Sequence, residues 1–264
     1  MPDPARYFDG TPPRVIAHRG LALHAPENTL DAFQAALENG ADILETDVHA
    51  SGDGVAVICH DDDLSRIAGV RLSVEQLPWA RLRELTLVGG GTLTRLETAL
   101  ACFPNARFNI DIKTDAALAP TIRVIRKAAA EPRVLVTSFQ QRRRRRAVRA
   151  LPGAATSAST PGVVLCLIGV WLRLAPLLRL ALRAVDAVQV PRRRGAVRVV
   201  SPVFVRAVHG AGKEVHVWTV DDPDEMRELL AIGVDGIVTD RCDLLRDIVH
   251  AGTAHNPRRP PGAS

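Results

Sequence analysis

Eight short apolar segments recur along the chain, and a pattern typical of a helix separates most of them. Their centres lie near residues 15, 44, 109, 135, 156, 188, 216 and 237. Strands that alternate with helices favour a parallel sheet, and eight such units in about 250 residues are typical of a closed (β/α)₈ barrel. The sequence therefore predicts the α/β class, with a (β/α)₈ TIM barrel.

The domain organisation follows from length and local composition. A chain of 264 residues suits one large α/β domain, and no repeat or low-complexity linker divides it. We expect a single barrel domain over residues 14–250. Residues 1–13 are rich in proline and charge and predict a flexible leader, and residues 251–264 are rich in proline and arginine and predict a disordered tail.

The second predicted strand carries two acids on one face. Side chains alternate along a strand, so Glu45, Asp47 and His49 point to the same side. Neighbouring carboxylates repel and are costly to bury, and a hard cation such as Mg²⁺ or Ca²⁺ is the usual remedy. A turn then returns the chain through a short hairpin strand, Val55–Ile58, to His60. A surface hairpin with solvated acids explains this segment equally well.

The third predicted strand also has a polar face. Ile110 and Ile112 occupy one side, whereas Asn109, Asp111 and Lys113 occupy the other. A buried parallel strand is normally apolar on both faces. The polar row therefore indicates a polar cavity or a ligand, with an exposed strand face as the alternative.

Polar side chains gather at the ends of several predicted strands. Active sites of (β/α)₈ barrels lie at the carboxyl ends of their strands. The residues at or near those ends are His18, Arg19, Glu45, Asp47, Asp111, Lys113, Trp218 and Asp240. Their coincidence predicts one shared pocket, although Trp218 could instead pack in the barrel and Asp240 could orient a loop.

Charge and apolar stretches bear on partners. A net charge of +5 favours an anionic substrate or an anionic membrane. The arginine run 142–146 falls in a predicted helix without aromatic neighbours, so we expect mostly solvated side chains and no nucleic-acid binding. Charged residues and Pro176 interrupt the apolar stretch Val163–Val185, which excludes a membrane span and predicts an amphipathic barrel helix, or alternatively a helix on a membrane surface.

The N-terminus and the cysteines indicate a compartment. The first residues contain no apolar signal-peptide core, and the four cysteines are widely scattered, without a C-x-x-C pair. We therefore expect a cytoplasmic protein, peripheral to the inner face of the membrane if the membrane-surface helix exists. The sequence makes no prediction of the oligomeric state.

Seven short motifs occur in a characteristic order along the chain. They are His18-Arg-Gly, Pro26-Glu-Asn-Thr29, Gly40-Ala-Asp with Glu45-Thr-Asp47-Val, Asp53-Gly, His60-Asp61, Trp218-Thr219 and Asp235-Gly-Ile-Val-Thr-Asp-Arg241. With these motifs the chain resembles the glycerophosphodiester phosphodiesterase family from Val15 to Leu245. The resemblance implies a (β/α)₈ barrel that uses a divalent cation to hydrolyse glycerophosphodiesters to glycerol 3-phosphate and an alcohol.

The resemblance also implies roles for individual residues. By the match, the metal ligands are Glu45, Asp47 and Asp111, and the catalytic acid/base pair is His18 and His60. The phosphate ligands are Arg19 and Lys113, and Trp218 lies beside the glycerol. The family usually has Glu as its third metal ligand, and this chain has the shorter Asp111 at that position. Its Arg-x-Thr pattern is replaced by Arg66-Ile-Ala-Gly69, without the hydroxyl.

Two alternatives to this function remain open at the level of the sequence. One is a lysophospholipase D-like hydrolysis of lysophospholipids on the same barrel. The other is an inert barrel that binds phosphate esters or a membrane. A pair of histidines with three carboxylates argues against the inert barrel, because binding alone needs no proton transfer.

Overall fold

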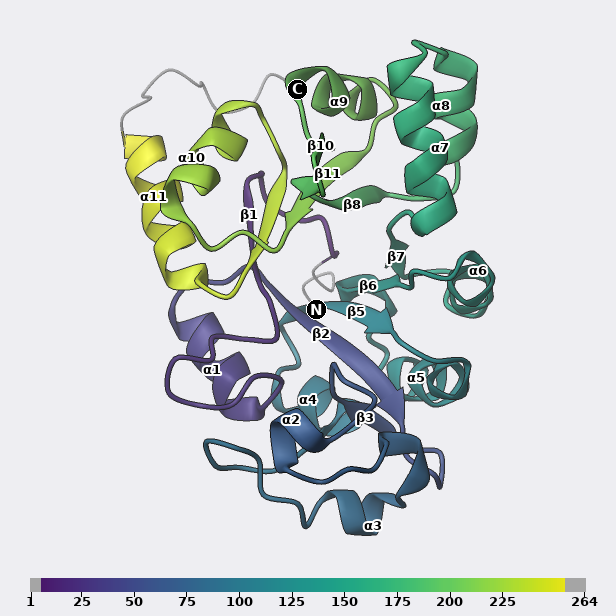
Figure 1. The fold of residues 1–264 in the computed structure, drawn as a ribbon, viewed down its shortest axis with the longest axis vertical. Helices are drawn as coiled ribbons and strands as arrows, with labels where there is room; N and C mark the ends of the chain where they lie inside the picture. Colours follow the sequence, from purple (N-terminus) through teal and green to yellow (C-terminus); the bar gives the residue numbers. More distant parts are fainter. Residues whose placement is uncertain (1–5, 255–264) are drawn as a thin grey trace.

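The computed structural model describes residues 6–254 and arranges eight parallel strands as a barrel (Figure 1). Neighbours follow the order β7-β6-β5-β2-β1-β12-β11-β8, and a parallel bridge from Ser157 to Ala187 joins the two ends. The strands are β1 (Arg14–Ala17), β2 (Ile43–Ala50), β5 (Arg107–Ile112), β6 (Val134–Thr137), β7 (Ala155–Thr156), β8 (Ala187–Pro191), β11 (Glu214–Trp218) and β12 (Gly236–Thr239). Each predicted strand position is occupied, which confirms the (β/α)₈ fold.

Helices surround the barrel, and side-chain caps define where several of them begin. Thr29 and Ser201 each accept a hydrogen bond from a backbone N–H in the first turn of the helix that follows. The surrounding helices are α1 (Leu30–Glu38), α4 (Leu96–Cys102), α5 (Asp115–Lys127), α6 (Gln141–Ala150), α9 (Pro202–His209), α10 (Pro223–Ala231) and α11 (Cys242–Ala254). A short 3₁₀ turn, η2 (Glu131–Arg133), leads into β6.

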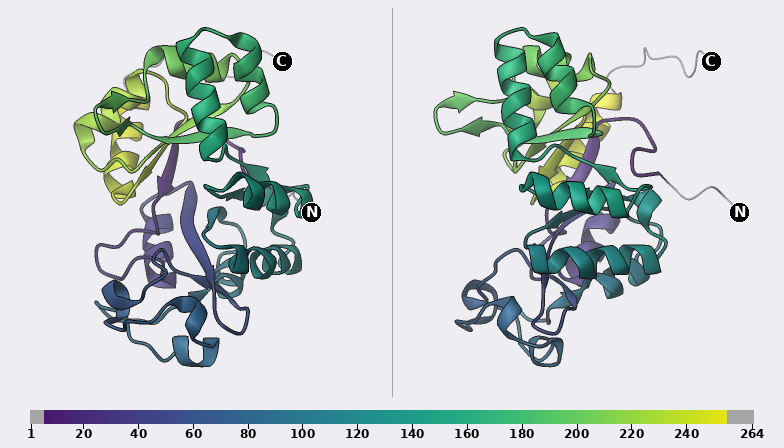
Figure 2. Two further views of the ribbon diagram at one scale, coloured as in Figure 1. Left: turned by 45° about the vertical axis from the view of Figure 1, so that its right-hand side comes forward. Right: turned by 90° about the vertical axis from the view of Figure 1, so that its right-hand side faces the viewer.

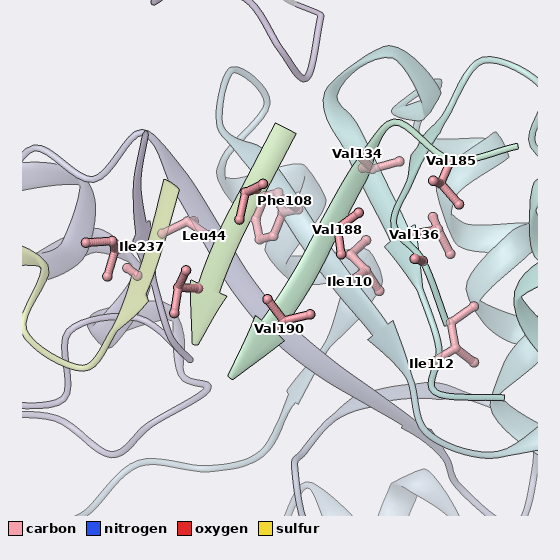
Figure 3. Packing of buried hydrophobic residues seen from close by; sticks show 14 of the residues in the cluster. Leu44, Phe108, Ile110, Ile112, Val134, Val136, Val185, Val188, Val190 and Ile237 are labelled. Atoms are coloured by element: carbon pink, nitrogen blue, oxygen red, sulfur yellow. The ribbon is translucent and has the colours of Figure 1, made fainter. Parts of the chain in front are cut away.

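The hydrophobic core lies between the strands and the helices. Phe108, Ile110 and Ile112 alternate along β5 and belong to the main buried cluster, part of which is seen in Figure 3. The residues between them, Asn109 and Asp111, line the pocket inside the barrel instead. Alternation along a strand thus separates an apolar outer face from a polar inner one.

A small insertion after β2 covers one side of the barrel and lies at the bottom of Figure 1. β3 pairs antiparallel with β2, and β4 pairs antiparallel with β3, which confirms the predicted hairpin. The insertion has its own buried cluster, which includes Val57, Leu64 and Leu82. Its elements are β3 (Ala56–Ile58), α2 (Ser65–Ala68), η1 (Val74–Gln76), α3 (Trp79–Leu82) and β4 (Thr94–Arg95).

The prediction of one amphipathic helix over Val163–Val185 is wrong, because two antiparallel helices occupy this stretch (Figure 2). α7 (Thr160–Trp171) and α8 (Ala175–Leu182) are separated by a turn in which Arg173 has a φ of 55°. Pro176 stands in the first turn of α8, where its missing N–H is tolerated. Within residues 6–254, no helix has both the length and the apolar character needed to cross a bilayer.

Residues 6–13 are not the loose leader that the composition predicts. Tyr7 is only 2% exposed, and its N–H donates to the Pro132 carbonyl at 2.8 Å. Its ring packs edge-on against Phe8, beside the ion pair between Arg14 and Glu214. An aromatic side chain that covers apolar barrel residues outweighs the polarity of the residues around it. The predicted tail lies outside the described residues from 255 onward, and residues 251–254 end α11.

Tyr7 offers a test of this packing. Its hydroxyl is buried without a hydrogen-bond partner among the described residues. We expect Tyr7→Ala to lower the free energy of unfolding by about 3–5 kcal/mol, as for other buried aromatic residues. Tyr7→Phe should leave it unchanged or raise it slightly, because the unpaired hydroxyl is removed. Denaturant unfolding measures both, and equal stability of the alanine variant and the parent would contradict the buried position.

Candidate active site

Asp240 does not line the pocket, but the other eight residues predicted for the site do, around a volume of about 220 Å³ at the carboxyl ends of the barrel strands. Different elements supply them, so the pocket exists only once the barrel has closed. They are His18 and Arg19 after β1, Glu45 and Asp47 in β2, His60 after β3, Asp111 at the end of β5 with Lys113 beyond it, and Trp218 at the end of β11.

The register of β2 against β5 brings the acids together. Asp47 stands opposite Asp111 in this parallel pair, and Glu45 stands opposite Asn109. The Lys113 ammonium lies between the two aspartates, 2.6 Å from Asp47 Oδ1 and 2.8 Å from Asp111 Oδ2. Burial alone would lower the pKa of Lys113, but the two carboxylates outweigh burial and raise it. The ammonium is therefore the counter-charge of both aspartates.

Glu45 is held by the backbone of the first motif. The Arg19 N–H donates to Glu45 Oε2 at 3.1 Å, and Arg19 adopts the left-handed backbone region with a φ of 56°. Gly20 follows at a φ of 85°, where a Cβ would lie 2.7 Å from the Ala32 backbone, so only glycine fits. Burial, assisted by the charge of Asp47, raises the pKa of Glu45 to about 8.

The first candidate acid/base residue is paired with a carboxylate. His18 Nδ1 lies 2.7 Å from Asp240 Oδ1, the aspartate whose role the sequence leaves open. Burial acts to lower the pKa of His18, but the hydrogen bond to Asp240 and the nearby charge of Glu45 outweigh it, so the pKa lies above its ordinary value. Asp240 therefore orients the imidazole and favours its protonated form.

The second candidate imidazole belongs to a longer chain of contacts. His60 Nδ1 lies 2.7 Å from Asp61 Oδ1, and Arg66 donates to the other oxygen of Asp61 at 2.5 Å. Arg66 also donates to Glu27 at 2.6 Å, and Glu27 accepts from Arg19 at 3.1 Å. This chain connects the insertion to the first barrel strand and fixes His60 relative to Arg19.

His49 shares the acid-bearing strand but does not line the pocket. It is 3% exposed, and its Nε2 lies 3.2 Å from the carbonyl oxygen of His60. Burial lowers the pKa of His49. Its role is to support the backbone of His60.

Two aromatic side chains form the rim of the pocket. Trp218 packs edge-on against Phe139, with ring centroids 6.2 Å apart, and Lys113 Nζ lies 5.8 Å from the centre of the Phe139 ring. Phe139 is 58% exposed and follows β6. The sequence patterns did not mark Phe139 as a site residue, although its place just beyond a strand end was the signal available. Gln189 was missed too, and its signal was a polar side chain between Val188 and Val190 in the middle of β8.

The carboxylates fit a hard divalent cation by their chemistry. Among residues 6–254 no three His, Cys, Asp or Glu side chains are already gathered around one point, and the Lys113 ammonium lies between two of the predicted ligands. Asp47 Oδ2 and Asp111 Oδ1 are nevertheless buried without a hydrogen bond from any residue of 6–254, although Arg19 Nε lies 3.3 Å from Asp47 Oδ2. Oxygen atoms in this state need further positive charge, and carboxylate donors suit Mg²⁺ or Ca²⁺.

Two imidazoles, two cations and three acids in one barrel pocket define a (β/α)₈ enzyme suited to an anionic ester. The chain belongs to the Glycerophosphoryl diester phosphodiesterase family, whose sequence model matches residues 18–244, and it is an enzyme of that class.

Individual relatives agree over most of their length. The chain is 45% identical over 243 residues to "Probable glycerophosphodiester phosphodiesterase 2" of Mycobacterium tuberculosis, covering 90% of each protein. A solved glycerophosphodiester phosphodiesterase from Parabacteroides distasonis superposes with a TM-score of 0.74 at 25% identity, over 92% of this chain and 100% of the other. The fold is also that of an Oleispira antarctica phosphodiesterase solved with sn-glycerol-3-phosphate, with a TM-score of 0.75 at 24% identity, over 90% and 97% of the two chains.

The His18–Asp240 contact predicts a measurable change in acidity. We expect Asp240→Asn to lower the pKa of His18, because the carboxylate that raises it is removed while the burial that lowers it remains. Titration of the histidine ring protons by NMR, with His18→Asn to assign the resonance, measures this directly. The exposed His24 is the internal control, and an unchanged His18 titration in Asp240→Asn would contradict the assignment.

Proposed function

We propose that this pocket hydrolyses glycerophosphodiesters to glycerol 3-phosphate and an alcohol. The observation that carries the proposal is the convergence of two carboxylate-paired imidazoles on a pocket that also holds buried acids and two cations. A phosphodiester is an anion whose hydrolysis adds charge to its oxygens, so positive groups favour the transition state.

Arg19 and Lys113 bind the phosphate. The guanidinium of Arg19 offers a planar fork to two oxygens, and the ammonium of Lys113 offers a point charge. Without substrate both are paired with acids, Arg19 with Glu27 and Lys113 with the two aspartates. The phosphate oxygens therefore compete with carboxylates for these donors.

Glu45, Asp47 and Asp111 would hold a divalent cation, Mg²⁺ or Ca²⁺. When bound, such a cation polarises phosphoryl oxygens and offsets their developing charge. Asp47 Oδ2 and Asp111 Oδ1, which accept no hydrogen bond within residues 6–254, and the ionised carboxylate of Glu45 are the oxygens suited to it. Lys113 would then be free to turn from the aspartates to the substrate.

His18 and His60 move the protons. One imidazole accepts a proton from the nucleophile and the other donates one to the departing alkoxide, each contributing roughly 10²–10⁴-fold in rate. Each has a carboxylate on Nδ1, so each presents Nε2 to the reacting atoms. Trp218 and Phe139 form the apolar wall beside the glycerol.

We include a cytoplasmic location and peripheral contact with an anionic membrane in the same proposal. All four cysteines lie within the described residues and are free thiols, which suits a reducing compartment. The proposed substrate is a small phosphodiester. Assays of glycerophosphocholine and lysophosphatidylcholine side by side distinguish this function from the lysophospholipase D-like alternative, which would favour the lipid.

Removal of either imidazole tests the proton transfers. We expect His18→Ala and His60→Ala each to lower kcat for glycerophosphocholine by roughly 10²–10⁴-fold. Cation binding should persist in both variants, because neither residue is a proposed ligand. His24→Ala, which removes an exposed imidazole outside the pocket, is the matched control. Full activity in both pocket variants would refute the assignment.

The acids are tested by cation binding itself. We expect Glu45→Gln, Asp47→Asn and Asp111→Asn each to weaken Mg²⁺ or Ca²⁺ binding at least roughly tenfold in calorimetry, because a charged oxygen donor becomes neutral. Asp31→Asn, on the exposed face of α1, should bind as the parent does. Asp111→Glu should retain binding, and chelator should abolish turnover until the cation is restored. Undiminished affinity in all three pocket variants would place the cation elsewhere.

A further inference from the structure

The net charge of +5 conceals a strong division of charge along the chain. Residues 132–213 contain fifteen arginines and one lysine but a single acid, Asp186. The rest of the chain has 18 basic and 28 acidic residues, so the two parts carry +15 and −10. No acid at all occurs between Glu131 and Asp186, over the residues that form α6, α7 and α8.

These three helices lie on one side of the molecule, which faces the viewer in the right-hand panel of Figure 2. Two arginines of α6 are buried, with Arg143 paired to Asp115 and Arg144 bonded to the Ala184 carbonyl. Seven other arginines here are exposed, and none forms an ion pair within the described part of the chain. They are Arg142, Arg145, Arg146, Arg149, Arg173, Arg179 and Arg183. We call these helices with their exposed arginines the basic face.

The hairpin of α7 and α8 ends in an exposed apolar tip. Trp171 is 82% exposed, and Leu172 and Leu174 on either side of Arg173 are 48% and 46% exposed. An indole ring is apolar except for one N–H that needs a hydrogen-bond partner. Tryptophan is therefore enriched at membrane interfaces, where the ring lies in apolar surroundings and the N–H can reach water. Arginine beside it can keep its charge in water while its stem lies on apolar surface.

A groove of about 600 Å³ runs between α6 and the hairpin. Leu165 and Leu180 give it apolar walls, and Arg145 and Arg149 line it with positive charge. It begins next to the catalytic pocket, because the Phe139 carbonyl at the pocket rim accepts a hydrogen bond from the first N–H of α7. The basic face and the catalytic pocket are therefore adjacent.

Resting on the membrane contact included in the proposed function, we propose that the basic face docks on an anionic lipid bilayer, with the tip around Trp171 in the interfacial layer and the α6 arginines on lipid phosphates. Unpaired guanidinium groups beside an exposed tryptophan complement a surface that is anionic outside and apolar beneath. Nucleic acid would complement the charge but not the apolar tip. A second copy joined through the same face would bring like charges together, since this face contains no acid.

Vesicle co-sedimentation tests the docking. The probes are vesicles of phosphatidylcholine alone and vesicles of phosphatidylcholine and phosphatidylglycerol in equal parts. The parent protein should bind only the mixed vesicles, and high salt should release it. The catalytically inactive His18→Ala protein should bind equally well, so failure of the proposed hydrolysis and failure of docking are distinguished.

Paired variants separate the contribution of charge from that of apolar contact with the membrane. Arg145→Gln with Arg149→Gln should lower partitioning onto mixed vesicles by roughly tenfold or more. Arg71→Gln with Arg83→Gln removes the same charge from the exposed insertion and should have little effect. Trp171→Ser should weaken binding, whereas Val88→Ser, at a site 69% exposed on the insertion, should not. Soluble-substrate activity should be unchanged in all four, which controls for folding.

Fluorescence reports the tip itself. Emission of the parent should shift to shorter wavelength on mixed vesicles as Trp171 leaves water, and Trp171→Phe should keep binding but lose the shift. The proposal is overturned if the parent does not bind mixed vesicles, or if the Arg145 and Arg149 pair binds as the parent does. It is equally overturned if the protein forms a dimer in solution that Trp171→Ser dissociates.

Discussion

The pairing of β2 with β5 in one register decides whether this barrel has a site at all. A shift of β2 by one residue would turn Glu45 and Asp47 from the interior to the helix-covered face, away from Asp111 on β5, because side chains alternate along each strand. In the observed register Asp47 and Asp111 meet inside the barrel, where burial and mutual repulsion raise the pKa of Asp111 although Lys113 opposes them. The positive charge of Lys113 between the two aspartates therefore stabilises the folded barrel.

That stabilisation explains why each positive group of the pocket is already paired. Lys113 neutralises both aspartates, and Arg19 contacts Glu27 and lies 3.3 Å from Asp47. Such pairs favour the folded barrel only while the partners remain together, since an unpaired buried charge is costly. The same donors that stabilise the acids of the pocket are therefore the ones that an anionic substrate has to compete for.

The sequence could predict the parts of this arrangement that depend on alternation and strand ends. Short apolar segments separated by helical patterns located all eight barrel strands, and the strand-end rule placed Glu45 and Lys113 in the pocket. It could not place Lys113 between two acids, because that contact depends on the register of separate strands. The break at Arg173 was missed, although Pro176 in the first turn of α8 was a signal that a new helix begins there.

The pairing inside the pocket also determines where the long-range field of the protein originates. Charges that are matched over about 3 Å contribute little beyond a Debye length of about 8 Å, so Arg19 and Lys113 attract an anion only at short range. The seven exposed arginines of α6, α7 and α8 form no ion pair within residues 6–254, so their charge is not compensated in this way. Catalytic charge and attractive charge thus belong to different parts of the chain. The barrel interior carries its acids paired with cations, and the neighbouring surface of α6, α7 and α8 remains positive because these helices contain no acid.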